Sequence, residues 1–242
     1  MKIKQNINYH LGAFKLVFEE LKAGNFLLFF LPGVVASVFF LSIYSLTAET
    51  TSLFDFLEYI PLIGSYLSGG VSKTFGLIMF LMLQIYIFFL LTILSPFNTV
   101  LSEKLDAKLT GKEYVFDFGQ VMLDLLRMIF VVFIALFLEY FTMVIYWILS
   151  WILHLDFLDT IAYILISAFY FGFSFYDYSL ERHKQGVFTS LGFAFKNMGI
   201  VTLTGLCFLL LFYFPYVGVI LAPVITTMIA TVVYLKKNQL IH

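Results

Sequence analysis

The sequence predicts an all-α integral membrane protein with two transmembrane helices, two helical hairpins and amphipathic surface helices. The hairpins cross the membrane either fully or only in part. Of its 242 residues, 62% are hydrophobic and only 12% are charged, whereas about a quarter of an average soluble domain is charged. Several uncharged stretches reach about 20 residues, the length that a helix needs to cross a hydrocarbon core of roughly 30 Å. The bilayer is therefore the expected solvent.

Residues 1–25 predict an amphipathic helix at the membrane interface. Its apolar residues recur at helical spacing: Phe14, Val17, Phe18 and Leu21. Gly24 is expected to end this helix, and residues 26–46 follow without a charge as the first predicted span. Because a long amphipathic segment precedes the first apolar run, we expect no cleaved signal peptide.

Residues 75–94 form the second predicted span. It is expected to end before Pro96, because proline lacks an N–H donor and disfavours a helical conformation in its predecessor. On residues 98–111, apolar and charged side chains alternate at helical spacing, which predicts a surface helix with Asn98 as its N-cap. The Pro96-Phe97-Asn98 break would then set the angle between the span and the surface helix.

Two hairpins are predicted in the second half of the chain. Residues 128–176 contain two apolar stretches separated by a polar tip at residues 154–159. Residues 200–235 are too long for one crossing, and three residues interrupt them: Pro215, Gly218 and Pro223. The first arm of this second hairpin, residues 200–214, spans only about 22 Å at the helical rise, so a re-entrant or tilted hairpin is expected.

Basic residues predict the orientation in the membrane, because lysine and arginine accumulate on the cytoplasmic side. They fall before the first span, after the second span, between the hairpins and at the C-terminus. If each hairpin leaves and returns on one side, every basic residue except Lys73 lies on that side. The sequence therefore predicts a multi-pass protein with cytoplasmic N- and C-termini.

Composition and motifs disfavour several classes of protein. The net charge of −1 creates no field that would recruit nucleic acid. The single cysteine, Cys207, excludes an intrachain disulfide and a cysteine-rich metal site. The sequence contains no H-E-x-x-H motif, glycine-rich phosphate loop or nucleophile elbow. We therefore expect neither an enzyme nor a protein with a metal or cofactor.

Three passages carry a resemblance to a known family. They are ILSPFNTVLSEKLDAKLTGK from Ile93, ISAFYFGFSFYDYSLERHK from Ile166 and FPYVGVILAPVITTMIATVVY from Phe214. The P-F-N break before an acidic-basic helix, and the D-Y pair before a charged turn, resemble the bacterial CysZ sulfate-uptake proteins. That family belongs with the eukaryotic etoposide-induced membrane proteins. The resemblance follows nearly the whole chain in order.

This resemblance implies two full transmembrane helices, hairpins that penetrate the membrane partly, and assembly into homo-oligomers. It further implies a permease or channel of the bacterial inner membrane that supplies sulfate, or a related small anion, for cysteine synthesis. A non-transporting membrane scaffold or membrane-shaping protein is the alternative. The surface helices, the partial hairpins and the scarcity of cations within the apolar segments favour that alternative.

Candidate anion sites follow from the chemistry of helix N-termini, where free backbone N–H groups hold anions and small residues allow close approach. Five residues that precede apolar segments are candidates: Gly24, Asn25, Gly69, Gly70 and Gly199. The alternative is that the glycines only separate helices. Arg182 is expected either to pair with Asp177 or, together with Lys184, to attract anions to a cytoplasmic mouth.

Glu139 lies within an apolar stretch, where a charge costs at least about 2.5 kcal/mol. It is therefore either a pore-lining or proton-coupling group, or a paired or protonated structural carboxyl. Asp177 is expected to pair with Arg182 or Lys196 and so to lock the first hairpin to the second. A solvated turn explains the remaining polar cluster better than a metal site: His154, Asp156 and Asp159.

Overall fold

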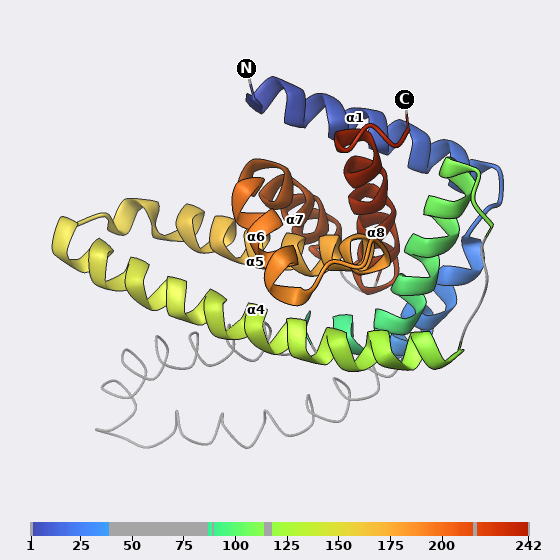
Figure 1. Cartoon of the computed structure of the whole chain (residues 1–242). Helices are drawn as coiled ribbons and strands as arrows, with labels where there is room; N and C mark the ends of the chain where they lie inside the picture. The colour runs from blue at the N-terminus through green and yellow to red at the C-terminus, as the bar shows by residue number, and fades with distance from the viewer. Residues whose placement is uncertain (1, 39–86, 89, 114–117, 215–216, 242) are drawn as a thin grey trace.

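The computed structural model describes residues 2–38, 87–88, 90–113, 118–214 and 217–241 (Figure 1). All regular secondary structure within these ranges is helical. Three helical segments in them are long and apolar enough to cross a membrane: Phe118–Leu153, Asp156–Arg182 and Val217–Lys237. Two bent helix pairs raise that number to five if each is one span. The chain is therefore an all-α membrane protein, as the sequence predicts.

The N-terminal helix α1 (Lys2–Lys22) ends at Gly24, as predicted. Gly24 has a φ of 80°, and the Asn25 N–H donates to the carbonyl oxygen of Glu20 at 3.1 Å, which is the pattern of a Schellman turn. The chain then bends by 101° into the segment Leu27–Val38. The rest of the first predicted span, residues 39–46, lies outside the described ranges.

α1 has a protein-facing side and an exposed apolar side. His10, Ala13 and Val17 are buried against the neighbouring helices α7 and α8. Four large apolar residues next to them are exposed: Ile7, Leu11, Phe14 and Phe18. The sequence places Val17 on one face with Phe14 and Phe18, but in the structure Val17 packs against protein and the two phenylalanines do not.

Residues 90–110 form one uninterrupted helix. The sequence predicts a break before Pro96 and a new helix with Asn98 as its cap, whereas in the structure both residues lie inside the helix. Residues 75–86 of the second predicted span are outside the described ranges. The difference has a tertiary cause: Asn98, Leu101 and Leu105 are buried, and packing of this kind overrides local propensity.

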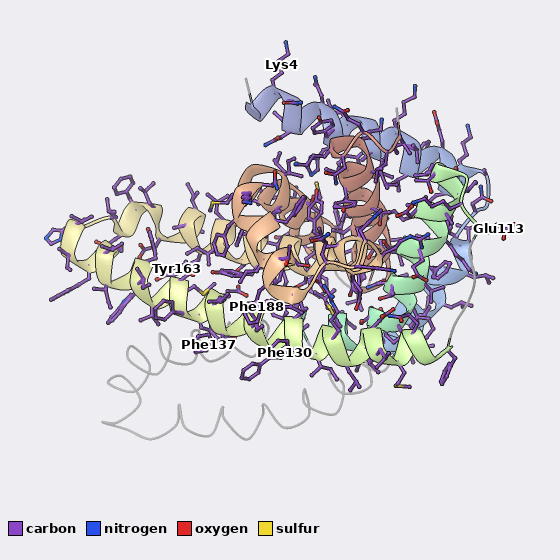
Figure 2. All side chains as sticks on the ribbon, viewed as in Figure 1. Lys4, Glu113, Phe130, Phe137, Tyr163 and Phe188 are labelled. Atoms are coloured by element: carbon purple, nitrogen blue, oxygen red, sulfur yellow. The ribbon has the colours of Figure 1, made fainter. Side chains whose placement is uncertain are left out.

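α4 (Phe118–Leu153) and α5 (Asp159–Arg182) form a long helical hairpin that extends away from the other helices (Figure 1). Its turn, which includes the 3-10 helix η3 (Asp156–Leu158), falls at the predicted polar tip. Figure 2 shows Phe130 and Phe137 pointing outward from α4, where both are exposed. The hairpin therefore presents an apolar outer surface, as a lipid-embedded element must.

α6 (Val187–Lys196) and α7 (Met198–Phe212) meet at an angle of 97°, and α8 (Val217–Lys237) returns along α7. α7 has only 15 residues, in keeping with the short first arm that the sequence predicts. Pro223 lies inside α8, and Pro215 lies outside the described ranges. Gly218 is required at the turn, because a Cβ there would lie 2.6 Å from the carbonyl oxygen of Phe212.

Candidate functional site

Three helices bring polar side chains together in the interior of the bundle. We call this group the hydroxyl cluster; it comprises Ser95, Asn98 and Ser102 of the helix 90–110, Tyr178 and Ser179 of α5, and Thr231 of α8. None of the six is more than 3% exposed. The spacing of the first three, at intervals of three and four residues, places them on one helix face.

In one half of the hydroxyl cluster, three hydroxyl groups form a triangle of close contacts. Ser102 Oγ lies 2.9 Å from Thr231 Oγ1 and 3.3 Å from Ser179 Oγ. Ser179 Oγ donates to Thr231 Oγ1 at 3.3 Å, and Thr231 Oγ1 donates to the Thr227 carbonyl oxygen at 2.8 Å. This triangle joins the three helices without any charge.

The other half of the hydroxyl cluster has unsatisfied polar atoms. The Tyr178 hydroxyl faces Asn98 and Ser95. Within the described part of the chain, however, Ser95 Oγ, Asn98 Nδ2 and Tyr178 Oη make no hydrogen bond of good geometry. Each buried polar group left without a partner costs about 1–3 kcal/mol. All three groups can donate, so they match a small ligand rich in acceptors.

A buried ion pair lies next to the hydroxyl cluster in the chain. Asp177, the neighbour of Tyr178, is 1% exposed and accepts two hydrogen bonds from Arg127 of α4, at 2.8 and 3.1 Å. Arg127 also donates to the Gln185 carbonyl oxygen at 2.6 Å and to Ser190 Oγ at 3.2 Å. The prediction that Asp177 pairs with Arg182 or Lys196 is therefore wrong. Asp177 ties together the two arms of the first hairpin.

Arg182 forms a second ion pair, with acidic residues of the helix 90–110. Its Nε lies 3.1 Å from Asp106 Oδ2, and its Nη1 lies 3.9 Å from Glu103 Oε1. His183 Nε2 also contacts Asp106, at 3.2 Å. Lys184 is exposed. Arg182 thus connects the end of α5 to the helix 90–110, and its partners are Asp106 and Glu103 instead of the predicted Asp177.

The predicted helix-terminal anion sites do not come together in the described part of the chain. Gly24 ends α1, and the Asn25 side chain donates to Glu20 Oε2 at 2.9 Å. Gly199 lies in the first turn of α7 beside α1, where a Cβ would meet Asn6 Nδ2 at 2.7 Å. The last two candidates lie outside the described ranges: Gly69 and Gly70.

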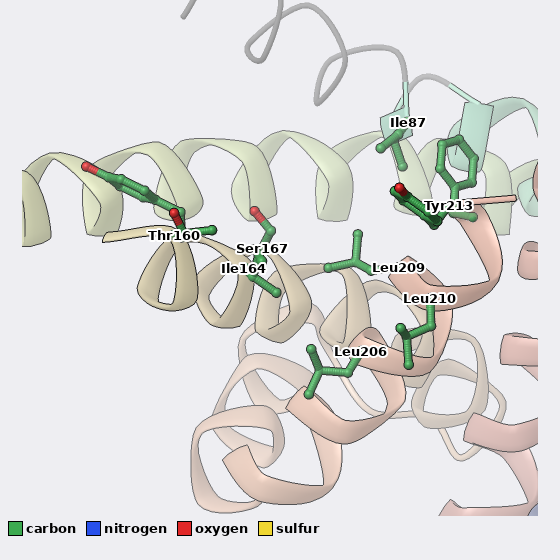
Figure 3. A pocket seen from close by; sticks show the side chains of 10 residues that line it. Ile87, Thr160, Ile164, Ser167, Leu206, Leu209, Leu210 and Tyr213 are labelled. Carbon is green, nitrogen blue, oxygen red and sulfur yellow. The ribbon is translucent and has the colours of Figure 1, made fainter. Parts of the chain in front are cut away.

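Glu139 lies inside the first hairpin and not on its lipid-facing surface. It is 0% exposed and hydrogen-bonds with Ser167 of α5. Ser167 also lines an open apolar groove of about 730 Å³ between α5 and α7 (Figure 3). One helical turn along each arm, Thr142 Oγ1 contacts the Tyr170 hydroxyl at 2.7 Å. Polar side chains therefore meet inside the hairpin at two neighbouring positions.

At the tip of the hairpin, Asp159 Oδ1 accepts hydrogen bonds from Ser150 Oγ at 2.6 Å and from the Tyr146 hydroxyl at 3.1 Å. Asp159 therefore closes the turn between α4 and α5. His154 caps the adjacent backbone, with Nδ1 3.2 Å from the Trp151 carbonyl oxygen. Among the described residues, no group of three or more histidine, cysteine, aspartate or glutamate side chains is placed to hold a metal ion.

No protein-family model and no curated protein matches this chain. The site itself, however, unites the three passages that carry the resemblance described above. Asn98 comes from the first passage, Tyr178 from the second and Thr231 from the third, and the hydroxyl cluster is where they meet. Sequence reasoning missed this site because serine and threonine within an apolar helix leave the hydropathy pattern almost unchanged.

Proposed function

We propose that this protein is a permease or channel for a small anion, sulfate in the first instance, in the bacterial inner membrane. One observation carries the proposal: the hydroxyl cluster holds buried, unsatisfied donors at the junction of three helices. A protein that only anchored or shaped the membrane would gain stability from apolar side chains at these positions.

The hydrogen-bond donors of the hydroxyl cluster suit a transported anion, which must bind and then dissociate. Hydroxyl and amide groups bind an oxyanion without a net positive charge, so binding stays weak enough for release. Arg127 does not compete for this role, because Asp177 and Glu181 occupy its guanidinium. We place the anion pathway beside the hydroxyl cluster, with the ion pairs holding the helices around it. Cytoplasmic termini and a homo-oligomer belong to the same proposal.

Uptake of radiolabelled sulfate into liposomes tests this function. The purified chain should carry sulfate faster than protein-free liposomes, with competition by thiosulfate and sulfite and little competition by phosphate or chloride. Tyr178→Phe removes one buried hydroxyl with almost no change in volume and should lower the flux several-fold. Tyr213→Phe is the matched control, because Tyr213 is exposed. Absence of flux from folded wild-type protein would exclude the permease.

A membrane scaffold is the second candidate, and the exposed apolar face of α1 favours it. An amphipathic helix that lies in one leaflet expands that leaflet and can bend the membrane. Deletion of the gene separates the two functions. The permease predicts a growth defect that sulfate limitation makes worse, whereas the scaffold predicts normal sulfur nutrition with altered membrane morphology.

A further inference from the structure

One side of α1 is apolar and exposed. It consists of Ile7, Leu11, Phe14 and Phe18, which we call the α1 stripe; these residues are between 40% and 68% exposed. Their spacing of four, three and four residues keeps them on one helix face. The neighbouring face packs on α7 and α8, so α1 is held in place by protein while the α1 stripe stays uncovered.

The bend after α1 fixes how the helix lies relative to the bilayer. α1 and the segment Leu27–Val38 meet at 101°. That segment begins the first predicted span and also exposes apolar residues, including Leu31 and Val35. A span along the bilayer normal would place α1 roughly in the plane of the membrane, at the depth of the interface.

Three lysines accompany the α1 stripe. Lys4, Lys15 and Lys22 are exposed and are separated by 11 and 7 residues, which is close to three and two helical turns. They therefore form one row, and each lies one turn from a residue of the stripe. Figure 2 shows the Lys4 side chain extending away from the helices.

The acidic residues of α1 do not neutralise this row. Glu20 is engaged by Lys108 and Asn25, which leaves Glu19 as the one further carboxylate of the helix. In the part of the chain that the structure describes, no ion pair involves the three lysines of the row. The polar border of the α1 stripe is therefore net positive.

We propose that this face of α1 binds the headgroups of anionic phospholipids. The α1 stripe would lie at the boundary of the acyl chains, and the lysine stems would extend past it to place their ammonium groups on lipid phosphates. Each lysine near an anionic membrane surface raises the affinity roughly fivefold. This lipid site is independent of the proposed transport function.

Thermal unfolding of the full chain in lipid nanodiscs tests the proposal. Wild-type protein should melt at a higher temperature in phosphatidylcholine mixed with phosphatidylglycerol than in phosphatidylcholine alone, and added salt should shrink the difference. The triple variant Lys4→Gln, Lys15→Gln, Lys22→Gln should lose most of this difference. A second triple variant, Lys112→Gln, Lys184→Gln, Lys196→Gln, removes the same charge from exposed sites elsewhere and should keep it.

Two results would overturn the lipid site. One is a wild-type protein whose melting temperature does not respond to phosphatidylglycerol. The other is an equal loss of the response in both triple variants, which would assign the effect to net charge rather than to α1. Sulfate flux plays no part in this measurement, so failure of the permease would leave the result unaffected.

Discussion

The guanidinium of Arg127 joins three helices by single-residue contacts. It donates to both carboxylate oxygens of Asp177 on α5, and it reaches the Ser190 hydroxyl on α6. This two-pronged geometry needs the planar fork of arginine, which a lysine ammonium cannot reproduce. The role of Arg127 is therefore to hold α4, α5 and α6 together.

Arg127→Lys should destabilise the protein, because it leaves a buried carboxylate only partly compensated. Breaking a buried ion pair lowers the free energy of unfolding by about 3–5 kcal/mol. We expect Arg127→Lys to cause a large share of that decrease. Thermal unfolding in detergent micelles measures the effect, with Lys184→Gln as a control at an exposed cation. An unchanged melting temperature for Arg127→Lys would contradict the assigned role.

A buried histidine makes the docking of α1 sensitive to acid. His10 Nδ1 lies 2.8 Å from the Asn6 carbonyl oxygen, so it carries the proton, and Nε2 accepts from Thr204 Oγ1 at 2.9 Å. Burial lowers the pKa of His10 below its ordinary value of 6.5. The unfolded chain therefore binds the proton more readily than the folded one, and stability falls as the pH drops below about 6.5.

Replacing His10 with Asn should remove that acid-sensitive part of the stability. Melting temperatures measured from roughly pH 8 to pH 5 should decline less steeply for His10→Asn than for the wild type. His154→Asn, at the hairpin tip, should follow the wild-type profile. Identical profiles for all three proteins would show that His10 does not set the acid response.

The ion pair between Arg127 and Asp177 shows which contacts of a single residue cannot be predicted from the sequence. Asp177 is recognisable as a buried charge that needs a partner, but its partner, Arg127, lies 50 positions away and resembles a cytoplasmic loop residue. Gly24, by contrast, acts on its own backbone, so its role as a helix end is predictable. A residue that acts on its neighbouring backbone can be recognised in the sequence. A contact between residues far apart in the sequence cannot, because it depends on how the helices pack.

At the scale of elements, the contact between α5 and α7 depends on two glycines. A Cβ at Gly172 would overlap the carbonyl oxygen of Val201, and a Cβ at Gly205 would overlap that of Ala168. Because Gly172 faces Val201 and Gly205 faces Ala168, the two helices run antiparallel. Small residues at such contacts let helix backbones approach closely, which is a main source of helix association in membranes.

Gly205→Ala should push α7 away from α5, because the new methyl group meets backbone that cannot rotate aside. Overpacking of this kind costs about 1–3 kcal/mol or more. Gly192→Ala is the matched control, since a Cβ at Gly192 meets no atom within 4 Å. Comparing the melting temperatures of both variants checks the contact, and equal values would contradict it.

Hydropathy and periodicity locate α1, the tip of the first hairpin and the short α7, but they do not indicate α6. They fail at Pro96, where local preference favours a break and the helix 90–110 continues. The cause is visible in Ser102, which bonds to residues of α5 and α8. Contacts from two other helices keep this segment in a single helix, and these contacts cannot be inferred from a sequence pattern.

At the scale of the whole molecule, the basic ends of the chain meet. Lys236 of α8 lies beside Gly12 of α1, Lys108 pairs with Glu20, and Lys237 lies over the Phe193 ring at 5.4 Å. The C-terminal end of α8 therefore lies under α1, and the helix 90–110 reaches the C-terminal end of α1 (Figure 1). This arrangement supports the proposed common sidedness of these segments.

Cysteine labelling tests the sidedness directly. Single cysteines at Gly186 and Leu240, introduced into a Cys207→Ala background, should both react with a membrane-impermeant maleimide from the cytoplasmic side only. Both positions are exposed, and a side chain at Gly186 meets open space. Reaction of the two positions from opposite sides would contradict the predicted topology.

The length of α4 has a consequence for the membrane around it. Its 36 residues extend over about 54 Å at the helical rise, against a hydrocarbon core of roughly 30 Å. Exposed apolar side chains occur from Leu123 to Leu153, so most of the helix is more stable in contact with lipid than with water. This hydrophobic mismatch must be relieved by an oblique helix or a locally thickened bilayer, and the protein should therefore respond to the acyl-chain length of its host membrane.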